Sequence, residues 1–206
     1  MSLVCMGAII GESVEMDEQR LPHLHKGNEM LLPDSTGPGQ WRGGMGTYNI
    51  LHPLHTRISI ADYQDAEVFP PRGVLGGYHS IPNEHWILDT KTGKPKKRLP
   101  HCALNYCEED EDWLQISQGG AGFGNPLDRD PERVRRDARN DLISLKSARD
   151  DYGVVLKTDT ELYDVDYEAT EKLRAELRKK PRDIEWKKRR AGDLLDRYPI
   201  IKNTYQ

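Results

Sequence analysis

The sequence has few of the residues that build a large apolar core. Only two of its 206 residues are Phe, and Leu, Ile, Val and Phe together make up about 21%. That share is close to the composition at which chains often fail to fold alone. No apolar run approaches the roughly 18 residues that a membrane-spanning helix needs, which excludes an integral membrane protein. The composition is therefore thin for a self-sufficient core of this length.

Cysteine is also scarce. The three cysteines, Cys5, Cys102 and Cys107, are an odd and small number. This argues against a secreted disulfide scaffold and predicts a reducing compartment, the cytoplasm. The first ten residues are apolar, but no basic region precedes them and Glu12 and Glu15 follow closely, so they do not predict a signal peptide.

Glycine and proline are abundant but unevenly placed. Of 18 Gly and 13 Pro, 16 Gly and 11 Pro lie within residues 1–131. These residues interrupt regular structure every few positions, so this part of the chain is predicted to be built from short strands and turns. A tight turn is expected at residues 89–94, and strands are expected at residues 48–51, 57–60, 85–89 and 113–117.

The sequence after residue 129 has helical patterns. Asp130 is predicted to cap a helix that Pro131 opens. Ser144 is predicted to cap a second, short helix that stops at Gly153. Residues 154–156, Val-Val-Leu, then return to a strand-like pattern.

The last quarter of the chain is highly charged. Two more helices are expected at residues 167–180 and 182–197, separated by Pro181, which disfavours helical geometry in the residue before it. We therefore predict an α+β fold. It consists of a β-rich domain with short C-terminal helices at residues 1–156 and a helical arm for partner contact at residues 157–206.

The stretch richest in functional signals is residues 33–46, PDSTGPGQWRGGMG, in which five glycines fall within ten residues. Such glycines indicate left-handed turns or a close approach of two backbones. The amides of Gly43, Gly44 and Gly46 beside Arg42 suit a phosphate ligand. However, the sequence lacks the Lys-Ser/Thr of a Walker loop and a Gly-x-Gly-x-x-Gly helix start. The pattern favours a structural alternative, a rigid turn in which Arg42 holds neighbouring carboxylates or carbonyls.

A second glycine stretch, residues 118–131, leads from a strand into the capped helix. Its glycines are Gly119, Gly120, Gly122 and Gly124. The start of a helix can bind an anion, but Asp128 and Asp130 stand there and would repel one. We interpret the stretch as a strand-to-helix crossing. Together with Arg42, the two glycine loops are the candidate binding or interface surface.

Other clusters give weaker signals. His101, Cys102 and Cys107 lack the paired Cys-x-x-Cys spacing of a zinc site, so free thiols are the favoured interpretation. Acidic residues 108–112 are expected to form a solvated loop. Basic residues 187–190 are expected on a solvated or partner-facing helix rather than at a nucleic-acid site. No nucleophilic triad or pair of catalytic carboxylates is marked in the sequence.

The two glycine stretches are also where the sequence resembles a known family. Residues 33–46 are similar to the P-D-S-G-G-P-G-x-(Y/W)-R-G-G-x-G signature of the hydantoinase B/oxoprolinase family, and PPRGVLGGY at residues 70–78 resembles its P-P-x-G-x-x-G-G segment. Residues 119–130 resemble G-G-G-G-Y-G-D-P-L-x-R-D, and residues 144–156 resemble S-x-x-x-A-R-x-x-Y-G-V-V-L. The order and spacing agree across residues 15–156.

The sequence departs from these patterns at three positions. Thr36 and Ala121 stand where the family usually has Gly, and Asn125 stands where it usually has Asp. The last change removes support for a carboxylate-dependent role at position 125. In addition, the signature usually ends a much longer chain, whereas here it begins almost at the N-terminus. The chain is therefore expected to be the C-terminal part of such a subunit, encoded or cleaved separately.

The resemblance implies one part of an ATP-dependent enzyme. In this family a hydantoinase A-like, actin-fold subunit handles ATP, and the hydantoinase B-like subunit activates a carbonyl substrate. Our first hypothesis is a small subunit of an ATP-dependent ketone carboxylase of the acetone or acetophenone type, which completes a larger hydantoinase B-like subunit. The close alternative is the same role in a hydantoinase or 5-oxoprolinase.

The resemblance also sets expectations for cofactors and partners. ATP and a divalent metal are expected on the partner subunits of a hetero-oligomer, with no nucleic acid and no membrane involved. An alternative of another class is a stand-alone regulatory or zinc-binding module. That alternative requires a metal at His101, Cys102 and Cys107.

Overall fold

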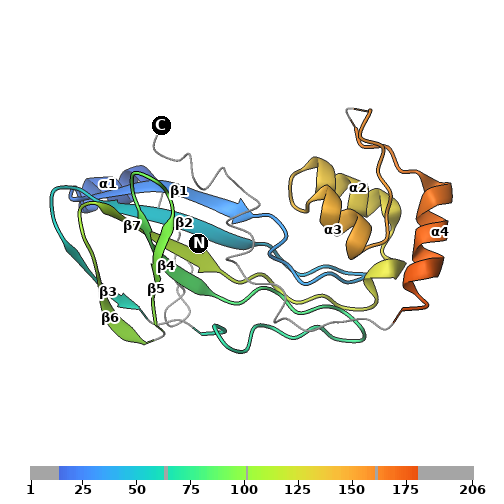
Figure 1. Cartoon of the computed structure of the whole chain (residues 1–206), viewed down its shortest axis with the longest axis horizontal. Helices are drawn as coiled ribbons and strands as arrows, with labels where there is room; N and C mark the ends of the chain where they lie inside the picture. The colour runs from blue at the N-terminus through green and yellow to red at the C-terminus, as the bar shows by residue number, and fades with distance from the viewer. Residues whose placement is uncertain (1–13, 63–64, 101, 161, 181–206) are drawn as a thin grey trace.

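An antiparallel sheet of five strands forms the body of the protein (Figure 1). The computed structural model describes residues 14–62, 65–100, 102–160 and 162–180. In spatial order the strands are β1 (Leu24–Leu32), β2 (Gly46–Pro53), β7 (Glu111–Ser117), β4 (Glu84–Asp89) and β5 (Pro95–Arg98). A second antiparallel pair consists of β3 (Ile58–Asp62) and β6 (Ala103–Cys107).

The central strand β7 shows how the sheet buries side chains on both faces. Buried and half-buried residues alternate along it, as the two-residue period of a strand requires. Leu114 and Ile116 belong to a core cluster on one face. Trp113 points to the opposite face, where it packs with a cluster that includes Ile60 of β3 and Ile87 of β4. The β3–β6 pair therefore covers one face of the sheet.

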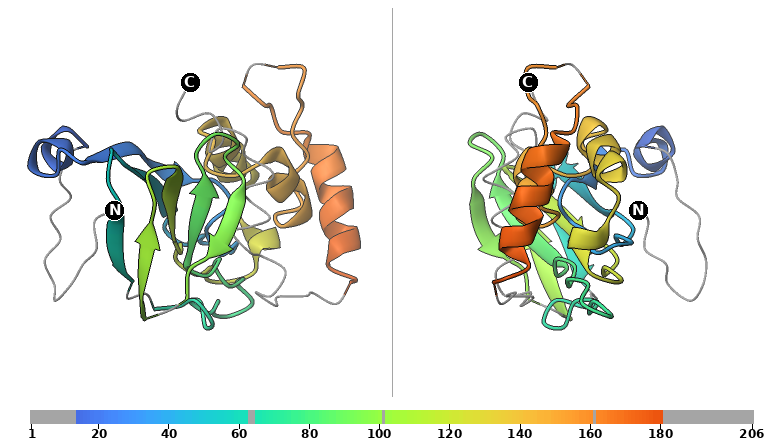
Figure 2. Two further views of the ribbon diagram at one scale, coloured as in Figure 1. Left: turned by 60° about the vertical axis from the view of Figure 1, so that its left-hand side comes forward. Right: turned by 90° about the vertical axis from the view of Figure 1, so that its right-hand side faces the viewer.

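The helices gather at one end of the molecule (Figures 1 and 2). They are the 3₁₀-helix η1 (Pro126–Asp128) and the α-helices α2 (Pro131–Arg139), α3 (Leu145–Asp150) and α4 (Tyr167–Leu177). A separate short helix, α1 (Val14–Arg20), precedes β1. The end cluster has its own core, formed by Val134, Ala138, Ile143, Ala148, Tyr152, Val154 and Val165. None of the helices in the described ranges is long and apolar enough to cross a membrane.

Both predicted helix caps are confirmed. The Asp130 side chain accepts a hydrogen bond from the Glu132 amide at 3.0 Å at the start of α2, and Ser144 accepts one from the Ser147 amide at 3.0 Å. Gly153 follows α3 with a left-handed φ of 61°. The strand-like character predicted for residues 154–156 is confirmed only in part, because the segment forms an isolated antiparallel bridge between Leu156 and Val165 and no full strand.

The helix predicted at residues 167–180 exists but ends at Leu177. It lies on the end cluster: the Thr170 hydroxyl accepts a hydrogen bond from the Val155 amide at 3.0 Å, and Arg174 donates to the carbonyl of Tyr152 at 3.1 Å. The helix predicted at residues 182–197 lies outside the described residues. The boundary at residue 156 and the role of the arm in partner contact stay predictions.

The predicted α+β class is confirmed, as are all four predicted strands and the turn between β4 and β5. Strands β1, β5 and β6 were not predicted. In β1 a bulge between Lys26 and Asn28 interrupts the alternation. The four residues of β5, Pro-Lys-Lys-Arg, are all exposed at an edge of the sheet, so no apolar pattern marks them.

Candidate functional site

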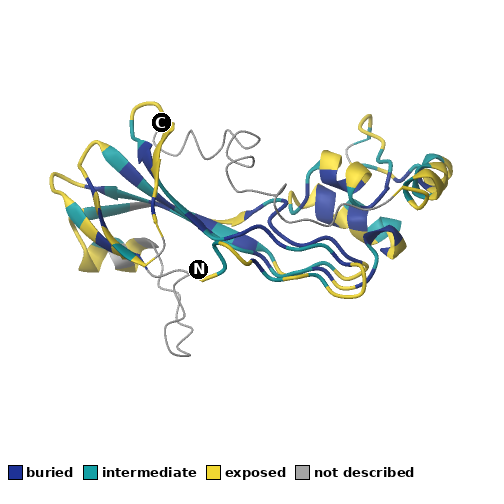
Figure 3. Ribbon diagram, turned by 60° about the horizontal axis from the view of Figure 1, so that its bottom comes forward, coloured by how far each residue is buried: buried dark blue, intermediate teal, exposed yellow. Residues whose placement is uncertain are grey.

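Three extended segments run side by side from the sheet to the helical end (Figure 3). They are residues 33–45, 71–82 and 118–125, which we call the glycine bundle. Backbone hydrogen bonds join each segment to the others. Gly37 donates to the Gly120 carbonyl at 2.8 Å, Gly122 to Tyr78 at 3.0 Å, and Tyr78 to Pro38 at 2.7 Å. The bundle therefore unites the motifs that the sequence marks separately.

The glycines allow these backbones to approach closely. A Cβ added to Gly43 would lie 1.9 Å from the carbonyl oxygen of Gly120, and one on Gly122 would lie 2.0 Å from that of Pro38. A real Cβ cannot occupy such positions, because the atoms it would meet belong to backbone. Among the glycines of the bundle, only Gly76 and Gly124 have a left-handed φ, 86° and 71°. Of the two explanations for the glycines, close approach accounts for most of them.

The amides of the bundle are largely committed to other protein groups. The amide of Gly43 donates to the carbonyl of Gly37, that of Gly120 to Gly44, and that of Gly124 to Val74. A phosphate cradle needs several amides that converge on an outside anion, and these amides point at carbonyl oxygens instead. The backbone contacts thus favour the structural interpretation of the loops over phosphate binding.

The structure brings the other candidate glycines to the same region. The Gly46 amide donates to the Ser35 hydroxyl at 2.8 Å, where the bundle enters β2. A Cβ on Gly119 would lie 2.6 Å from the Ser35 carbonyl oxygen. Gly44 differs from its neighbours, since it is exposed and an added Cβ would meet nothing within 4 Å.

Arg42 connects the bundle to the helical end through a carboxylate. Its Nε donates to Asp137 Oδ2 at 2.9 Å, and its Nη1 donates to the Gly43 carbonyl at 3.1 Å. Arg129 approaches the same Asp137 Oδ2 at 2.8 Å and also donates to the Gln40 carbonyl at 3.0 Å. Arg42 therefore holds a carboxylate and a carbonyl, as the structural interpretation of its motif predicts.

Sequence reasoning missed Asp137 and Arg129. Asp137 lies on α2, where its backbone position places it beside the buried Val134 and Ala138. Both partners are shielded from water: 10% of the Asp137 side chain and 8% of the Arg129 side chain are exposed. The sequence signal that indicates such a pair is an acidic residue on the apolar face of a helix, because a buried charge needs a partner of opposite charge.

A second link joins the bundle to the helices. Asp34 is buried and has a left-handed φ of 57°. Its amide donates to the Leu142 carbonyl at 3.1 Å, and its side chain accepts from the Ser144 amide at 2.8 Å. The first glycine motif and the Ser144 motif therefore contact each other directly, although 110 residues separate Asp34 from Ser144.

Exposed apolar residues lie on three paired segments of the bundle. Trp41 and Phe123 pair through reciprocal backbone hydrogen bonds of 3.0 and 2.9 Å, and Val74 is bridged to Phe123 from the other side. Side chains of residues that pair directly across strands point to the same face, so these three lie together. With Leu75, which follows Val74, they form what we call the apolar rim. All four are exposed.

A polar cluster lies at the opposite end of the sheet. The His52 Nδ1 atom lies 2.8 Å from Asp112 Oδ1, and the Thr90 hydroxyl donates to the same oxygen at 3.0 Å. Only 3% of the Asp112 side chain is exposed, and burial raises the pKa of its carboxyl. The prediction that residues 108–112 form a solvated loop is therefore wrong for Glu111 and Asp112, which begin strand β7. His52 and Thr90 also line a surface hollow of about 320 Å³.

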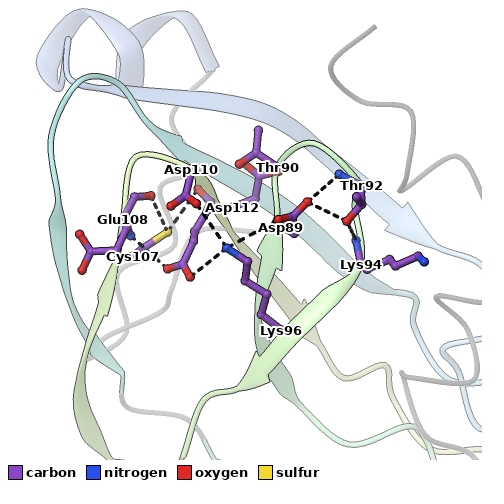
Figure 4. A network of polar contacts seen from close by, with 10 residues as sticks. Asp89, Thr90, Thr92, Lys94, Lys96, Cys107, Glu108, Asp110 and Asp112 are labelled. Atoms are coloured by element: carbon purple, nitrogen blue, oxygen red, sulfur yellow. Dashed lines mark hydrogen bonds and ion pairs between the residues drawn. The ribbon is translucent and has the colours of Figure 1, made fainter.

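Cys107 is buried beside the same acidic segment, residues 108–112 (Figure 4). Its thiol donates to the Glu111 carbonyl at 3.4 Å, and burial raises its pKa to about 12, so the sulfur stays protonated. Cys102 is exposed, and His101 lies outside the described residues. In the part of the chain that the structure describes, no three His, Cys, Asp or Glu side chains are grouped to hold a metal ion.

These contacts define an α+β scaffold module in which a glycine bundle joins a sheet to a helical end and presents an apolar rim. The chain belongs to the hydantoinase B/oxoprolinase family, whose model matches residues 2–126. The resemblance seen in the glycine motifs is thereby confirmed.

Individual proteins are also similar in sequence to this chain. The chain is 30% identical over 157 residues to the caprolactamase subunit beta of Pseudomonas jessenii, a match that covers 75% of this chain and 27% of the relative. It is 28% identical over 205 residues to the acetophenone carboxylase delta subunit of Aromatoleum aromaticum, covering 80% of this chain and 29% of the relative. The chain thus spans between a quarter and a third of the length of these relatives.

Solved structures share the fold. An ATP-dependent caprolactamase from Pseudomonas jessenii superposes with a TM-score of 0.71 at 27% identity, over 83% of this chain and 29% of that one. A nucleotide-free acetone carboxylase superposes with a TM-score of 0.64 at 23% identity, over 76% of this chain and 25% of that one. The match to acetone carboxylase supports the fold alone.

Proposed function

We propose that this chain is a small subunit of a multi-subunit, ATP-dependent enzyme and completes a larger hydantoinase B-like subunit. The observation that carries the proposal is that two relatives, the caprolactamase subunit beta and the acetophenone carboxylase delta subunit, are themselves named as subunits. The low content of large apolar residues supports a module that completes its core in an assembly.

The reaction we favour is the ATP-dependent carboxylation of a ketone. The match to the acetophenone carboxylase delta subunit supports it, because that match covers 80% of the chain. The 28% identity to this subunit is close to the identity to the caprolactamase subunit, so identity alone does not distinguish the two reactions and a direct assay must do so.

A second candidate is ATP-dependent opening of a cyclic amide, as in a hydantoinase, an oxoprolinase or a lactamase. It is supported by the 30% identity to the caprolactamase subunit and by the TM-score of 0.71 to the caprolactamase structure. Both reactions require activation of a carbonyl group, and the role of this chain as a completing subunit is the same in each.

We further propose that neither ATP nor the catalytic metal is held by this chain. The bundle amides of Gly43, Gly120 and Gly122 are bonded to carbonyls, and no metal-ligand cluster is found within the described ranges. As the family resemblance implies, we assign ATP to a hydantoinase A-like, actin-fold subunit and the divalent metal to the partner subunits. In this proposal the chain contributes the docked scaffold of a cytoplasmic hetero-oligomer.

Co-expression of the tagged chain with the large hydantoinase A-like and B-like chains of the same genome tests the proposal. We expect the three to co-purify in a fixed ratio. Incorporation of labelled bicarbonate into acetone or acetophenone would identify the carboxylase, and ADP release with a lactam or hydantoin would identify the amide hydrolase. If the tagged chain purifies without either large chain, the proposed role is wrong.

A further inference from the structure

The apolar rim is a surface without an explanation in the fold. Trp41 is 51% exposed, Val74 53%, Leu75 73% and Phe123 48%. One exposed apolar side chain is ordinary, but adjacent ones drawn from three segments mark an interaction site on a protein surface. Large aromatic and aliphatic side chains of this kind serve as anchors at protein interfaces.

The backbone at Leu75 gives an independent reason to regard the rim as functional. Residues 74–77 form a tight turn closed by a 3.0 Å hydrogen bond from the Gly77 amide to the Val74 carbonyl. The two central residues have left-handed φ values, 50° at Leu75 and 86° at Gly76. Asn, Asp or Gly normally occupies the first of these positions, and a leucine there is strained. Strain of this kind clusters at sites of recognition and function.

The margin of the rim is positively charged. The guanidinium carbon of Arg133 lies 4.8 Å from the centre of the Trp41 ring, a cation–π contact at the edge of the rim. Arg72 is exposed two residues before Val74. A partner that fits this surface has an apolar hollow bordered by acidic side chains, since complementary charge selects partners and orients their encounter.

We propose that the apolar rim docks on the chain that supplies the rest of the hydantoinase B-like body, with Leu75, its most exposed side chain, as an anchor. This inference rests on the proposed function. The choice of occupant follows from the relatives, in which the part that matches this chain makes up only 27% and 29% of a longer subunit and must adjoin the rest of that body. The basic margin of the rim then faces an acidic margin on that chain.

Two substitutions at Leu75 separate docking from folding. Leu75→Gly removes the side chain and relieves the left-handed strain, and Leu75→Asn places a polar residue that tolerates this conformation. Neither change should lower the melting temperature of the full chain. We expect both to weaken binding to the immobilised large hydantoinase B-like chain by at least about ten-fold in Kd, as loss of an interface anchor does.

Leu104→Thr on β6 is the matched control, because Leu104 is also exposed, by 62%, and Thr suits a strand. It should leave the affinity unchanged. If both Leu75 variants bind as tightly as the wild type, the rim is not the docking surface, although the proposed function stands. If the rim instead mediates self-association, sedimentation will show a dimer that Leu75→Asn dissociates while binding to the large chain persists, which also overturns the inference. If the wild-type chain does not bind the large chain at all, the proposed function itself fails.

Discussion

Arg42 and Asp137 are 95 residues apart in the sequence, yet their side chains form a paired contact of 2.9 and 3.3 Å. Asp137 also binds Arg129 at 2.8 Å, so one carboxylate holds two guanidinium groups. Through this contact the glycine bundle is fastened to α2. The arrangement explains why an arginine interrupts a glycine-rich turn: it connects the sheet to the helical end.

Replacing this carboxylate should be strongly destabilising. Asp137→Asn keeps the shape of the side chain but leaves two largely buried guanidinium groups without their counter-charge. We expect the free energy of unfolding to fall by about 3 kcal/mol, as when one partner of a buried ion pair is removed. Urea denaturation measures the change. Glu168→Gln is the control, because the exposed Glu168–Lys172 pair contributes no more than about 0.5 kcal/mol.

Substitution by Ala should affect stability very differently at the adjacent Gly43 and Gly44. In Gly43→Ala the new methyl group would lie 1.9 Å from the Gly120 carbonyl oxygen, so the bundle must separate. We expect a loss of about 3 kcal/mol or failure to fold. Gly44→Ala introduces a methyl group into open space and should be neutral or slightly stabilising. Thermal unfolding compares them, and equal melting temperatures would contradict the close-packed bundle.

The pH dependence of stability should include a contribution from His85. Burial lowers the pKa of His85 below its ordinary value of 6.5, although Asp62 Oδ2 lies 2.8 Å from its ring and opposes the effect. The unfolded chain therefore binds a proton at His85 more readily than the folded one, and stability falls as the pH drops below about 6.5. His85→Gln should reduce this slope in urea titrations between pH 7 and pH 5. An unchanged slope would show that His85 does not contribute.

Cys107 should resist alkylation in the folded protein. Its buried thiol has a pKa raised to about 12, so little thiolate exists at pH 8. Peptide mapping after iodoacetamide treatment should show exposed Cys102 modified and Cys107 unmodified until urea is added. Metal analysis of the untreated protein tests the zinc-module alternative: stoichiometric zinc that is lost in Cys102→Ser would revive it.

The locally determined features were predictable from sequence. Asp130 and Ser144 cap their helices because a short polar side chain accepts a hydrogen bond from the amide two or three residues ahead. This local pattern is visible in the sequence itself. The four strands with apolar or aromatic alternation were equally visible. Strand β5 was not, because its pairing with β4 depends on a register that no apolar pattern in Pro-Lys-Lys-Arg specifies.

The long-range features of the site were not predictable in the same way. The motif around Arg42 indicated that the arginine holds a carboxylate, but Asp137 is one of many acidic residues and only the tertiary fold selects it. The sequence marked the glycines as positions of left-handed turns or of close backbone approach. The Cβ positions show that close contact between backbones explains most of them. The left-handed Leu75 carries no sequence signal, since leucine is rare in that conformation.

Adding the chain back to its partners tests the central claim most directly. The measurement is substrate-dependent ADP release by the large hydantoinase A-like and B-like chains, with and without this chain, and by this chain alone. We predict that the chain alone is inactive and that turnover by the large chains requires it. ATP hydrolysis or conversion of a carbonyl substrate by the isolated chain, or full activity of the large chains without it, would contradict the account.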